Sequence, residues 1–331
     1  MTKIKLEVST KPDPEWNQRM IKSGYGTIYQ SVERGLFLEK ENVPNYYLKF
    51  CLPGGKIIGQ LLISIRERFS NSDLKARIFK NMPLLKQKNC EWSYGPIIFD
   101  STFTNDVYVA LEEFLLSKNF RVNGWTHPLI TTQPNMTKNF QIRKWGTFLV
   151  DLTKSEDEVY SNIEKHSGRK NIERSIKRGV KVKQLDDDSI KDYYDLVKKF
   201  KNDSSRSTTG FEIFRRRWKT FQSLGFSGFL ATKENIPIGG LLFTFVNGHI
   251  IEIGVARSEI DTQKNLYSQD LIKWKIMEWG IKNKMKYYDL TGFNPEPISP
   301  KEEGIIKYKK KWGGKPYYYS RIISKKNPLR R

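Results

Sequence analysis

An internal repeat constrains the fold of this chain more than any other feature. The apolar run that begins at Ile58, Ile-Gly-Gln-Leu-Leu-Ile, recurs as Ile-Gly-Gly-Leu-Leu-Phe from Ile238, 180 residues later. Each copy follows a strand-like run and then a turn-like stretch, at 46–50 and 53–56 in the first half and at 228–232 and 233–237 in the second. A strand, a short turn and an apolar strand indicate a β-hairpin. Because the flanking segments match as well, we expect two copies of one fold.

The segments after each hairpin also correspond. In the first half a strand is expected at 94–99, a helix at 107–116 and a strand at 120–125. In the second half the same order is expected at 249–255, 269–281 and 287–290. Strand, helix and strand after a hairpin predict an α/β fold of the α+β kind, with mixed sheets. A length of 331 residues suits about two domains of roughly 150 residues each.

The second half opens with helices that carry many basic residues. Thr153 or Ser155 can cap the first helix, which runs towards Lys165. A basic helical stretch follows over 165–183, with Ile172 and Ile176 as its apolar stripe and with Gly179 as its terminator. A third helix is expected at 190–201, with Tyr193, Leu196, Val197 and Phe200 on one side.

The charge balance favours an anionic partner. The sequence has 58 Lys and Arg against 36 Asp and Glu, a formal charge of +22. Nucleic acids, phosphorylated small molecules and anionic membrane surfaces attract such proteins. A generally lysine-rich surface explains the excess equally well, so only clustered charges carry an argument. Basic residues cluster at 165–183, 215–217 and 307–311.

Several classes of site have no pattern in this sequence. The three histidines lack metal-ligand spacing, and Cys51 and Cys90 form no C-x-x-C pair. Neither a G-x-S-x-G elbow nor a G-x-x-x-x-G-K phosphate loop occurs. No apolar run approaches the roughly 18 to 20 residues that span a bilayer. We therefore expect a cytoplasmic protein without stable membrane insertion, bound metal or cofactor.

Several short motifs, taken in order, resemble the Fem family of the GNAT superfamily. Tyr308 and Lys309, before Gly313-Gly314, look like the aromatic-lysine pair of that family. The further matches are 24–31 and 94–97 in the first half, and 148–153, 178–182, 267–280 and 286–292 in the second. The chain has no long insertion between its second-half helices, so it is similar to the compact, FemX-like type.

The resemblance implies two tandem GNAT-like domains separated by a cleft. The first would cover 1–148 and regain a C-terminal strand at 320–331, and the second would cover 149–319. Such enzymes transfer an amino acid from charged tRNA to an amine on a cell-wall precursor. An aminoacyl ester is already activated, so the protein needs to orient the reactants and stabilise an oxyanion. No covalent nucleophile is required.

The resemblance also implies which residues act. Lys309 would bind the tRNA terminus or stabilise negative charge, Tyr308 would pack beside it, and Asp289 would orient the attacking amine or accept its proton. Further substrate contacts are expected from Tyr267, Arg169, Lys170, Arg174 and Arg206. The sequence departs from the family where an arginine and a tyrosine contact the acceptor's nucleotide, since Thr209 and Ile213 occupy those places. Arg206 lies nearby but out of register, which argues against a UDP-linked acceptor.

Two alternatives remain open from the sequence. A divergent acyl-CoA N-acyltransferase acting on a sugar or peptide amine would hold its pyrophosphate on a glycine-rich loop at a helix N-terminus. The corresponding segment, 256–267, contains no glycine, which disfavours this reading. A non-catalytic tRNA- or RNA-binding relative would use the same basic clusters without turnover.

Overall fold

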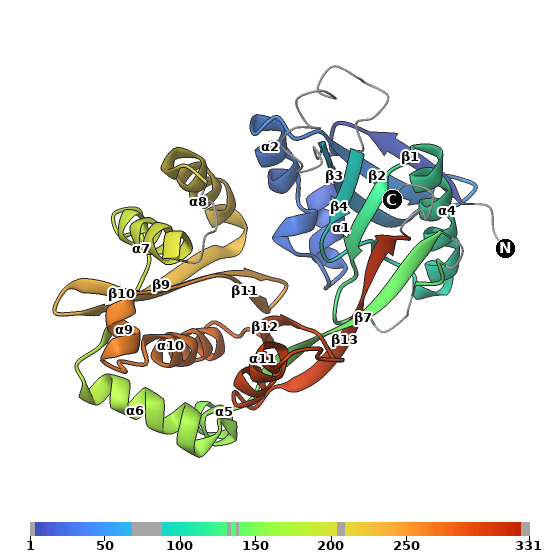
Figure 1. The fold of residues 1–331 in the computed structure, drawn as a ribbon. Helices are drawn as coiled ribbons and strands as arrows, with labels where there is room; N and C mark the ends of the chain where they lie inside the picture. Colours follow the sequence, from blue (N-terminus) through green and yellow to red (C-terminus); the bar gives the residue numbers. More distant parts are fainter. Residues whose placement is uncertain (1–3, 68–87, 131–133, 137–138, 204–208, 326–331) are drawn as a thin grey trace. The chain divides into compact units, whose positions relative to one another are not determined.

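The chain folds into two compact units. The computed structural model describes residues 4–67, 88–130, 134–136, 139–203 and 209–325. The first unit contains Met1–Trp145 and Tyr318–Arg331, and the second contains Gly146–Tyr317. Figure 1 draws both units as a ribbon, with labels on many of their helices and strands. Two strands, β7 (Phe140–Asp151) and β13 (Lys315–Ser324), have residues in each unit.

The first unit is a sheet with helices packed on it. Along the sheet the order is β1-β2-β3-β4-β6-β13, and β5 pairs with β3. Residues Arg321–Ile323 of β13 pair antiparallel with β6, whereas β4 and β6 are parallel. The elements are β1 (Lys5–Ser9), α1 (Trp16–Lys22), η1 (Ile28–Gln30), α2 (Val32–Lys40), β2 (Asn45–Cys51), β3 (Ile57–Glu67), β4 (Lys88–Trp92), β5 (Ile97–Ile98), η3 (Ser101–Phe103), α4 (Thr104–Ser117) and β6 (Arg121–Trp125).

The second unit repeats this plan with more helices. Its strand order is β7-β12-β11-β10-β9-β8, with β11 and β12 parallel. The remaining elements are α5 (Glu156–Asn162), η4 (Lys165–Arg169), α6 (Lys170–Lys177), β8 (Lys181–Gln184), α7 (Ile190–Asp203), α8 (Phe211–Gly225), β9 (Phe226–Lys233), β10 (Ile236–Val246), β11 (His249–Arg257), α9 (Glu259–Gln263), α10 (Ser268–Lys282), β12 (Tyr287–Phe293) and α11 (Pro300–Lys310).

The predicted hairpins are both present. Strands β2 and β3 pair antiparallel with Leu48 opposite Leu61, and β9 and β10 pair with Phe229 opposite Leu241. Leu61 and Leu241 are equivalent in the repeat, and each is fully buried in the apolar core of its own unit. The repeated apolar run therefore forms the central strand of each unit, as the sequence predicts. At Gly240 a Cβ atom would lie 2.5 Å from the ring of Tyr193, which explains the glycine there.

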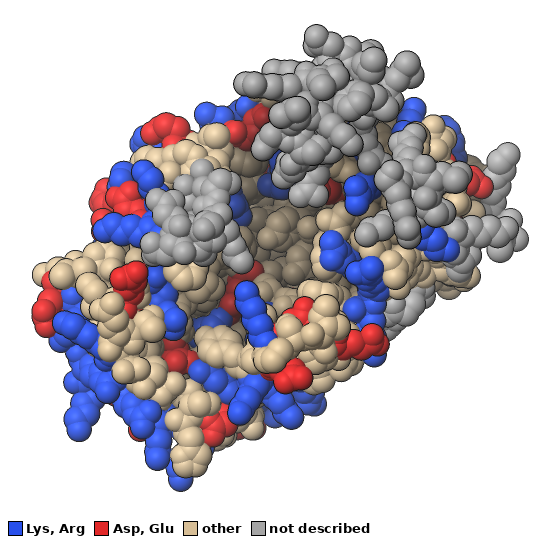
Figure 2. Space-filling model, viewed as in Figure 1, with Lys and Arg blue, Asp and Glu red and all other residues tan. Residues whose placement is uncertain are grey.

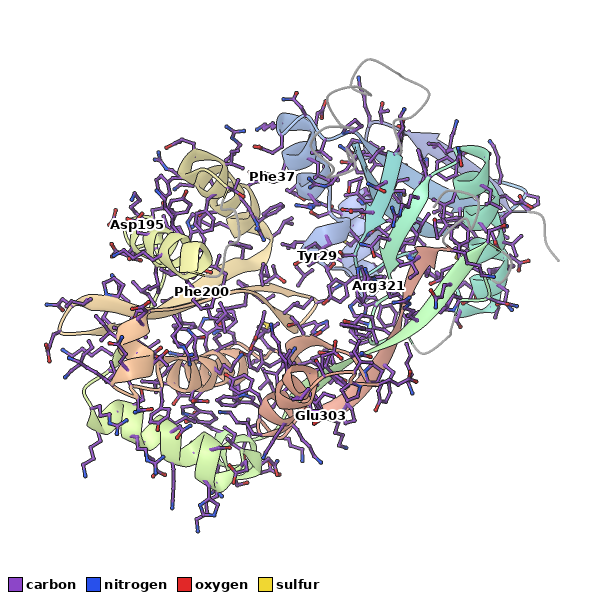
Figure 3. The ribbon with its side chains drawn as sticks, in the orientation of Figure 1. Tyr29, Phe37, Asp195, Phe200, Glu303 and Arg321 are labelled. Atoms are coloured by element: carbon purple, nitrogen blue, oxygen red, sulfur yellow. The ribbon has the colours of Figure 1, made fainter. Side chains whose placement is uncertain are left out.

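Helix α10 is buried on nearly every side, and Figure 3 draws the side chains that fill the space between it and the sheet. Its broad apolar face agrees with the prediction for 269–281. Ser155 caps α5 in a reciprocal capping box with Glu158, and Gly179 ends the basic stretch with φ 74°. Both features follow the sequence prediction.

Some predicted details were wrong. The expected strand at 94–99 is reduced to the two-residue β5, because Tyr94 adopts φ 54° and Pro96 lacks a backbone N–H for the ladder. The basic stretch is not one helix, since a π-helical turn, η4, precedes α6. Ile172 is buried against the second core, but Ile176 is 57% exposed and does not belong to an apolar stripe.

The repeat makes a stability prediction with a built-in control. Leu61→Ala and Leu241→Ala each remove a fully buried side chain from the central strand of a unit. We expect each to lower the free energy of unfolding by about 2–5 kcal/mol. Ile236→Ala, on the same strand as Leu241 but 53% exposed, should cost less than about 1 kcal/mol. Urea unfolding followed by tryptophan fluorescence measures all three, and a similar cost at Ile236 would contradict the assigned register.

Candidate functional site

The second unit contains an opening between two parallel strands. Strands β11 and β12 pair only from His249–Ile251 to Tyr287–Asp289, and no pairing continues beyond these residues. β12 then becomes irregular, since its register against β7 shifts between Asp289 and Gly292 and Thr291 has φ 60°. Ligands in α/β folds bind beyond the carboxyl ends of parallel strands, where neighbouring strands separate. The opening between β11 and β12 is therefore the natural place for a site.

Lys309 on α11 reaches this opening. Its Nζ donates to the carbonyl oxygen of Thr291 over 2.9 Å and to that of Gly292 over 2.7 Å. Among the described residues, no carboxylate forms an ion pair with this ammonium group. A lysine ammonium has three N–H donors, so one remains available after the two carbonyls are satisfied. Lys309 therefore presents a fixed positive charge with a donor to spare.

The environment of Lys309 weakens its hold on its proton. Burial lowers the pKa of the Lys309 side chain to about 8, although the carboxylate of Glu252 opposes that shift. The positive charge of Lys273 lowers this pKa further, and Asp289 raises it. The group is therefore a cation at neutral pH that becomes neutral within a mildly alkaline range.

Tyr308, the neighbour of Lys309, lies between two other lysines. The Nζ atoms of Lys311 and Lys273 lie 4.5 Å and 5.9 Å from the centroid of its ring. Each lysine is anchored by a buried carboxylate, Lys311 by Asp270 and Lys273 by Glu252. The ring itself is 38% exposed. The two lysines therefore hold the ring of Tyr308 through cation–π contacts, and the exposed part of the ring is accessible to a ligand.

A buried charged cluster beneath Tyr308 was not predicted from the sequence. Glu252 on β11 accepts hydrogen bonds from Lys273 on α10 and from the hydroxyl group of Tyr288 on β12. The three residues are 9%, 3% and 0% exposed. The sequence did contain a signal for this cluster, because the glutamate lies within an apolar strand and the lysine within an apolar helix face. Buried charges are costly unless paired, so such residues mark a site or a structural pair.

Asp289 is placed differently from its expected role. It is fully buried, and its Oδ1 accepts hydrogen bonds from the Thr147 hydroxyl at 2.5 Å and from the backbone N–H of Thr291 at 2.7 Å. Its Oδ2 lies 3.2 Å from Nε2 of His249. A carboxylate enclosed in this way cannot touch an acceptor amine. It fixes the irregular end of β12, and with it the carbonyl groups that hold Lys309.

The basic helix α6 adjoins this site. Lys311, at the C-terminal end of α11, donates through Nζ to the carbonyl oxygen of Ser167 in η4 over 2.9 Å. Lys170 and Arg174 of α6 are exposed and Arg169 is half-buried. Arg174 and Arg178 both lie over the ring of Tyr267, at 6.0 Å and 5.4 Å. Figure 2 shows Lys and Arg gathered over this part of the surface, at its lower left. Arg206 lies outside the described residues.

The N-terminus of α10 is already occupied by a protein carboxylate. Oδ1 of Asp261, on α9, accepts a hydrogen bond from the backbone N–H of Ser268 over 2.9 Å. Asp261 is 2% exposed, and Asp270 adds a second carboxyl group in the first turn of α10. An anionic ligand at this helix end would meet two acidic groups instead of free amides.

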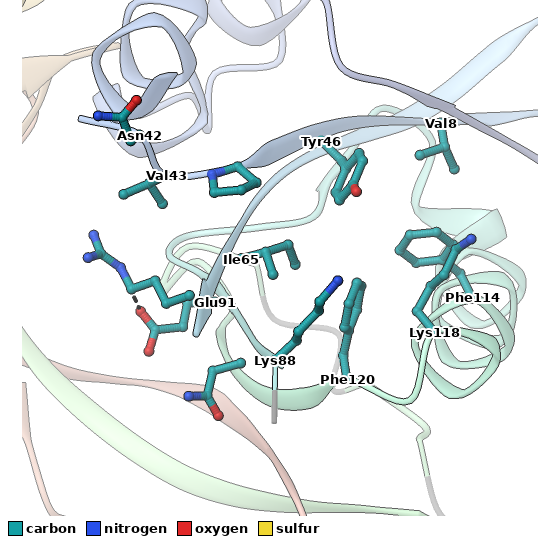
Figure 4. A pocket seen from close by; sticks show the side chains of 13 residues that line it. Val8, Asn42, Val43, Tyr46, Ile65, Lys88, Glu91, Phe114, Lys118 and Phe120 are labelled. Carbon is teal, nitrogen blue, oxygen red and sulfur yellow. Dashed lines mark ion pairs between the residues drawn. The ribbon is translucent and has the colours of Figure 1, made fainter. Parts of the chain in front are cut away.

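The first unit has a cavity of its own, of about 940 Å³ (Figure 4). Apolar side chains such as Tyr46, Phe114 and Phe120 line it, and an ion pair between Arg66 and Glu91 lies at its edge. None of the residues predicted to act lies there.

Within the described residues, no group of His, Cys, Asp and Glu side chains suits a metal ion. The same residues include no helix with the length and apolarity to cross a bilayer.

Comparisons with known proteins bear on this arrangement. The model of the FemAB family matches residues 96–226. No curated protein matches the sequence.

Solved structures match over almost the whole chain. FemX superposes with a TM-score of 0.66 at 13% identity, over 95% of this chain and 96% of its own. L-PGS from Bacillus licheniformis gives a TM-score of 0.55 at 12% identity, covering 98% of this chain and 95% of its own. A tandem GNAT protein from the clavulanic acid biosynthesis pathway gives 0.54 at 8%, covering 96% and 97%.

These likenesses confirm the predicted fold class, a tandem pair of GNAT-like α/β units. Because the family match starts in the first unit and extends to the end of α8 in the second, it is independent of the motifs around Lys309. The resemblance of this chain to the Fem family is therefore confirmed.

Proposed function

We propose that this protein is an N-acyltransferase that moves an aminoacyl group from charged tRNA to an amine, on a cell-wall precursor in the cytoplasm. The observation that carries the proposal is the Lys309 ammonium group, which two backbone carbonyls hold at the opening between β11 and β12. The family match over residues 96–226 supports the reaction class.

Lys309 suits the chemistry of ester aminolysis. When an amine attacks the ester carbonyl, negative charge develops on the carbonyl oxygen. A preorganised donor stabilises that charge without paying for reorientation during the reaction. The two carbonyl groups fix the ammonium, and its remaining N–H can point at the developing oxyanion. Asp289, by contrast, acts in this proposal as a positioning residue that maintains the end of β12.

The basic surface next to the site suits the nucleic-acid part of the donor. Lys170 and Arg174 lie on the exposed side of α6, and Arg169 lies where η4 meets α6. Lys311 bonds directly to η4, so this surface is continuous with the helix that carries Lys309. Contacts of Lys and Arg with phosphates position a nucleic acid, and exposed aromatic rings can stack on its terminal bases. Tyr308 and Tyr267 are the rings in reach of these cations.

Acyl-CoA is the weaker candidate donor. Enzymes that bind CoA in the usual way place its pyrophosphate on free amides at a helix N-terminus. Here the Ser268 amide at the start of α10 is bonded to Asp261, and the preceding segment has no glycine. A pyrophosphate would have to displace a buried carboxylate of its own charge sign. A binding protein without activity is disfavoured because it would have no need of a buried ammonium group that backbone carbonyls fix and no carboxylate pairs directly among the described residues.

Replacement of Lys309 tests the proposal directly. Lys309→Met removes the charge and both hydrogen bonds, and we expect transfer from charged tRNA to a small amine to fall by about 100-fold or more. Lys310→Met is the matched control, since Lys310 is the exposed neighbour on the same helix. Amide product is measured by mass spectrometry at saturating charged tRNA. Full transfer by Lys309→Met would remove Lys309 from the mechanism.

The lowered pKa of Lys309 predicts a pH dependence. The ammonium form acts, so its contribution is complete below the pKa of about 8 and is lost as the pH rises through it. Lys309→Arg keeps its charge throughout, because arginine is protonated at every accessible pH. The acceptor amine becomes more reactive at high pH in both proteins. The ratio of wild-type to variant transfer rate should therefore fall between pH 7 and 9, and a constant ratio would contradict the assignment.

A further inference from the structure

Glu252 is held by one of its oxygens only. Its two hydrogen bonds, from the ammonium group of Lys273 and from the hydroxyl group of Tyr288, both end on Oε1. No described residue donates a hydrogen bond to Oε2, and with 9% of Glu252 exposed this atom is not fully enclosed. The side chain is therefore fixed from three elements, β11, α10 and β12, while Oε2 keeps its capacity to accept a hydrogen bond.

The position of Glu252 relates it to Lys309. Glu252 is the first residue of β11 after its pairing with β12 ends at Ile251. Lys309 bonds the carbonyls of Thr291 and Gly292, which lie just past the end of that pairing on β12. Glu252 and Lys309 therefore approach the same strand opening, one from each strand. Of the charged groups around Lys309, Glu252 has the largest electrostatic effect on it.

We propose that Oε2 of Glu252 binds the attacking amine of the acceptor and takes its proton during transfer. This inference rests on the proposed aminoacyl transfer and names the catalytic base for it, in place of the enclosed Asp289. The acceptor group is an amine that carries an N–H, because a carboxylate oxygen can orient that donor and take its proton.

The step balances without any further reactant. The acceptor ammonium first loses one proton to water. The amine nitrogen then forms a bond to the ester carbon, and the carbonyl π electrons move to the oxygen beside Lys309. The resulting cationic nitrogen gives a proton to Oε2 of Glu252. As the bond from carbon to the ribose oxygen breaks, Glu252 returns that proton to the departing oxygen, which leaves an amide, a free hydroxyl group and an unchanged carboxylate.

The surrounding charges suit this role. The ammonium group of Lys273 from α10 pairs with Oε1 of Glu252 and holds the side chain in place, and the Tyr288 hydroxyl from β12 donates to the same oxygen. Asp289 from β12 is engaged by Thr147 and Thr291, so it does not compete for the amine. From α11, Lys309 supplies the opposite charge needed at the oxyanion. Asp270 is paired with Lys311.

The test compares two kinds of nucleophile. Glu252→Gln keeps the shape of the side chain but cannot accept a proton. With charged tRNA as donor and glycinamide as acceptor, we expect its turnover to fall by about 100-fold. Hydroxylamine is far less basic than glycinamide, and its nitrogen loses a proton more easily in the tetrahedral intermediate. With hydroxylamine as acceptor, the turnover of Glu252→Gln should therefore fall by less than about 10-fold. The affinity for charged tRNA, measured by filter binding, should stay unchanged.

Two controls keep the result interpretable. Glu278→Gln makes the same change in the ion pair of Glu278 with Lys275 at the outer face of α10, and should have no effect. Glu252→Asp keeps the charge but moves the carboxylate away from the acceptor amine. Each of the two variants, Glu252→Gln and Glu252→Asp, should therefore fold and yet lose transfer to glycinamide. Equal losses with both nucleophiles, or none with either, would overturn the role of Glu252 while wild-type transfer persists. Absence of transfer by the wild-type protein would instead reject the proposed function, and this inference with it.

Discussion

The separation of β11 from β12 leaves backbone carbonyl groups that the fold must satisfy. A sheet satisfies its carbonyls through the neighbouring strand, and an unpaired buried carbonyl costs stability. In this protein the ammonium group of Lys309 donates to the carbonyls of Thr291 and Gly292, and the Thr147 hydroxyl also donates to that of Thr291. The same interaction completes the fold of the second unit and fixes a cation where the strands open. Burial of that cation then lowers its pKa to about 8.

Each unit has a pair of parallel strands at the corresponding place in its sheet, and the two pairs differ in what lies at their ends. In the first unit the equivalent parallel strands are β4 and β6, and Gly124 on β6 is covered by the indole of Trp92, so closely that a Cβ there would lie 2.0 Å from the ring. The indole N–H of Trp92 donates to the Gly95 carbonyl over 3.0 Å. An aromatic side chain therefore covers the end of the parallel pair in the first unit, whereas a lysine and a glutamate lie near its end in the second. The two units have the same strand order, each around its own core, and differ at the ends of these strands.

The sequence predicts what local patterns determine. The repeated apolar run specified both hairpins, because Leu61 and Leu241 must be buried for each sheet to exist. Ser155, Gly179 and the apolar face of α10 were likewise readable from residue types and spacing. The strand at 94–99 and the stripe through Ile176 were not, because a left-handed Tyr94 and the bend at η4 depend on tertiary packing. The cluster of Glu252, Lys273 and Tyr288 escaped prediction for the same reason, as its members come from three separate elements. The basic cluster at 307–311 was visible in the sequence, but the roles of Lys309 and Tyr308 were assigned only through the family resemblance.

The identity of the donor is the central claim, and protection by ligand tests it most directly. The purified protein would be heated with a stable amide analogue of an aminoacyl-tRNA 3′ end, and separately with acetyl-CoA. A ligand at 100 times its Kd should stabilise the protein that binds it by roughly 2.7 kcal/mol. The account predicts a rise in melting temperature with the aminoacyl end and none with acetyl-CoA. A rise with acetyl-CoA alone would contradict it, and would mean that a pyrophosphate binds despite Asp261 at the start of α10.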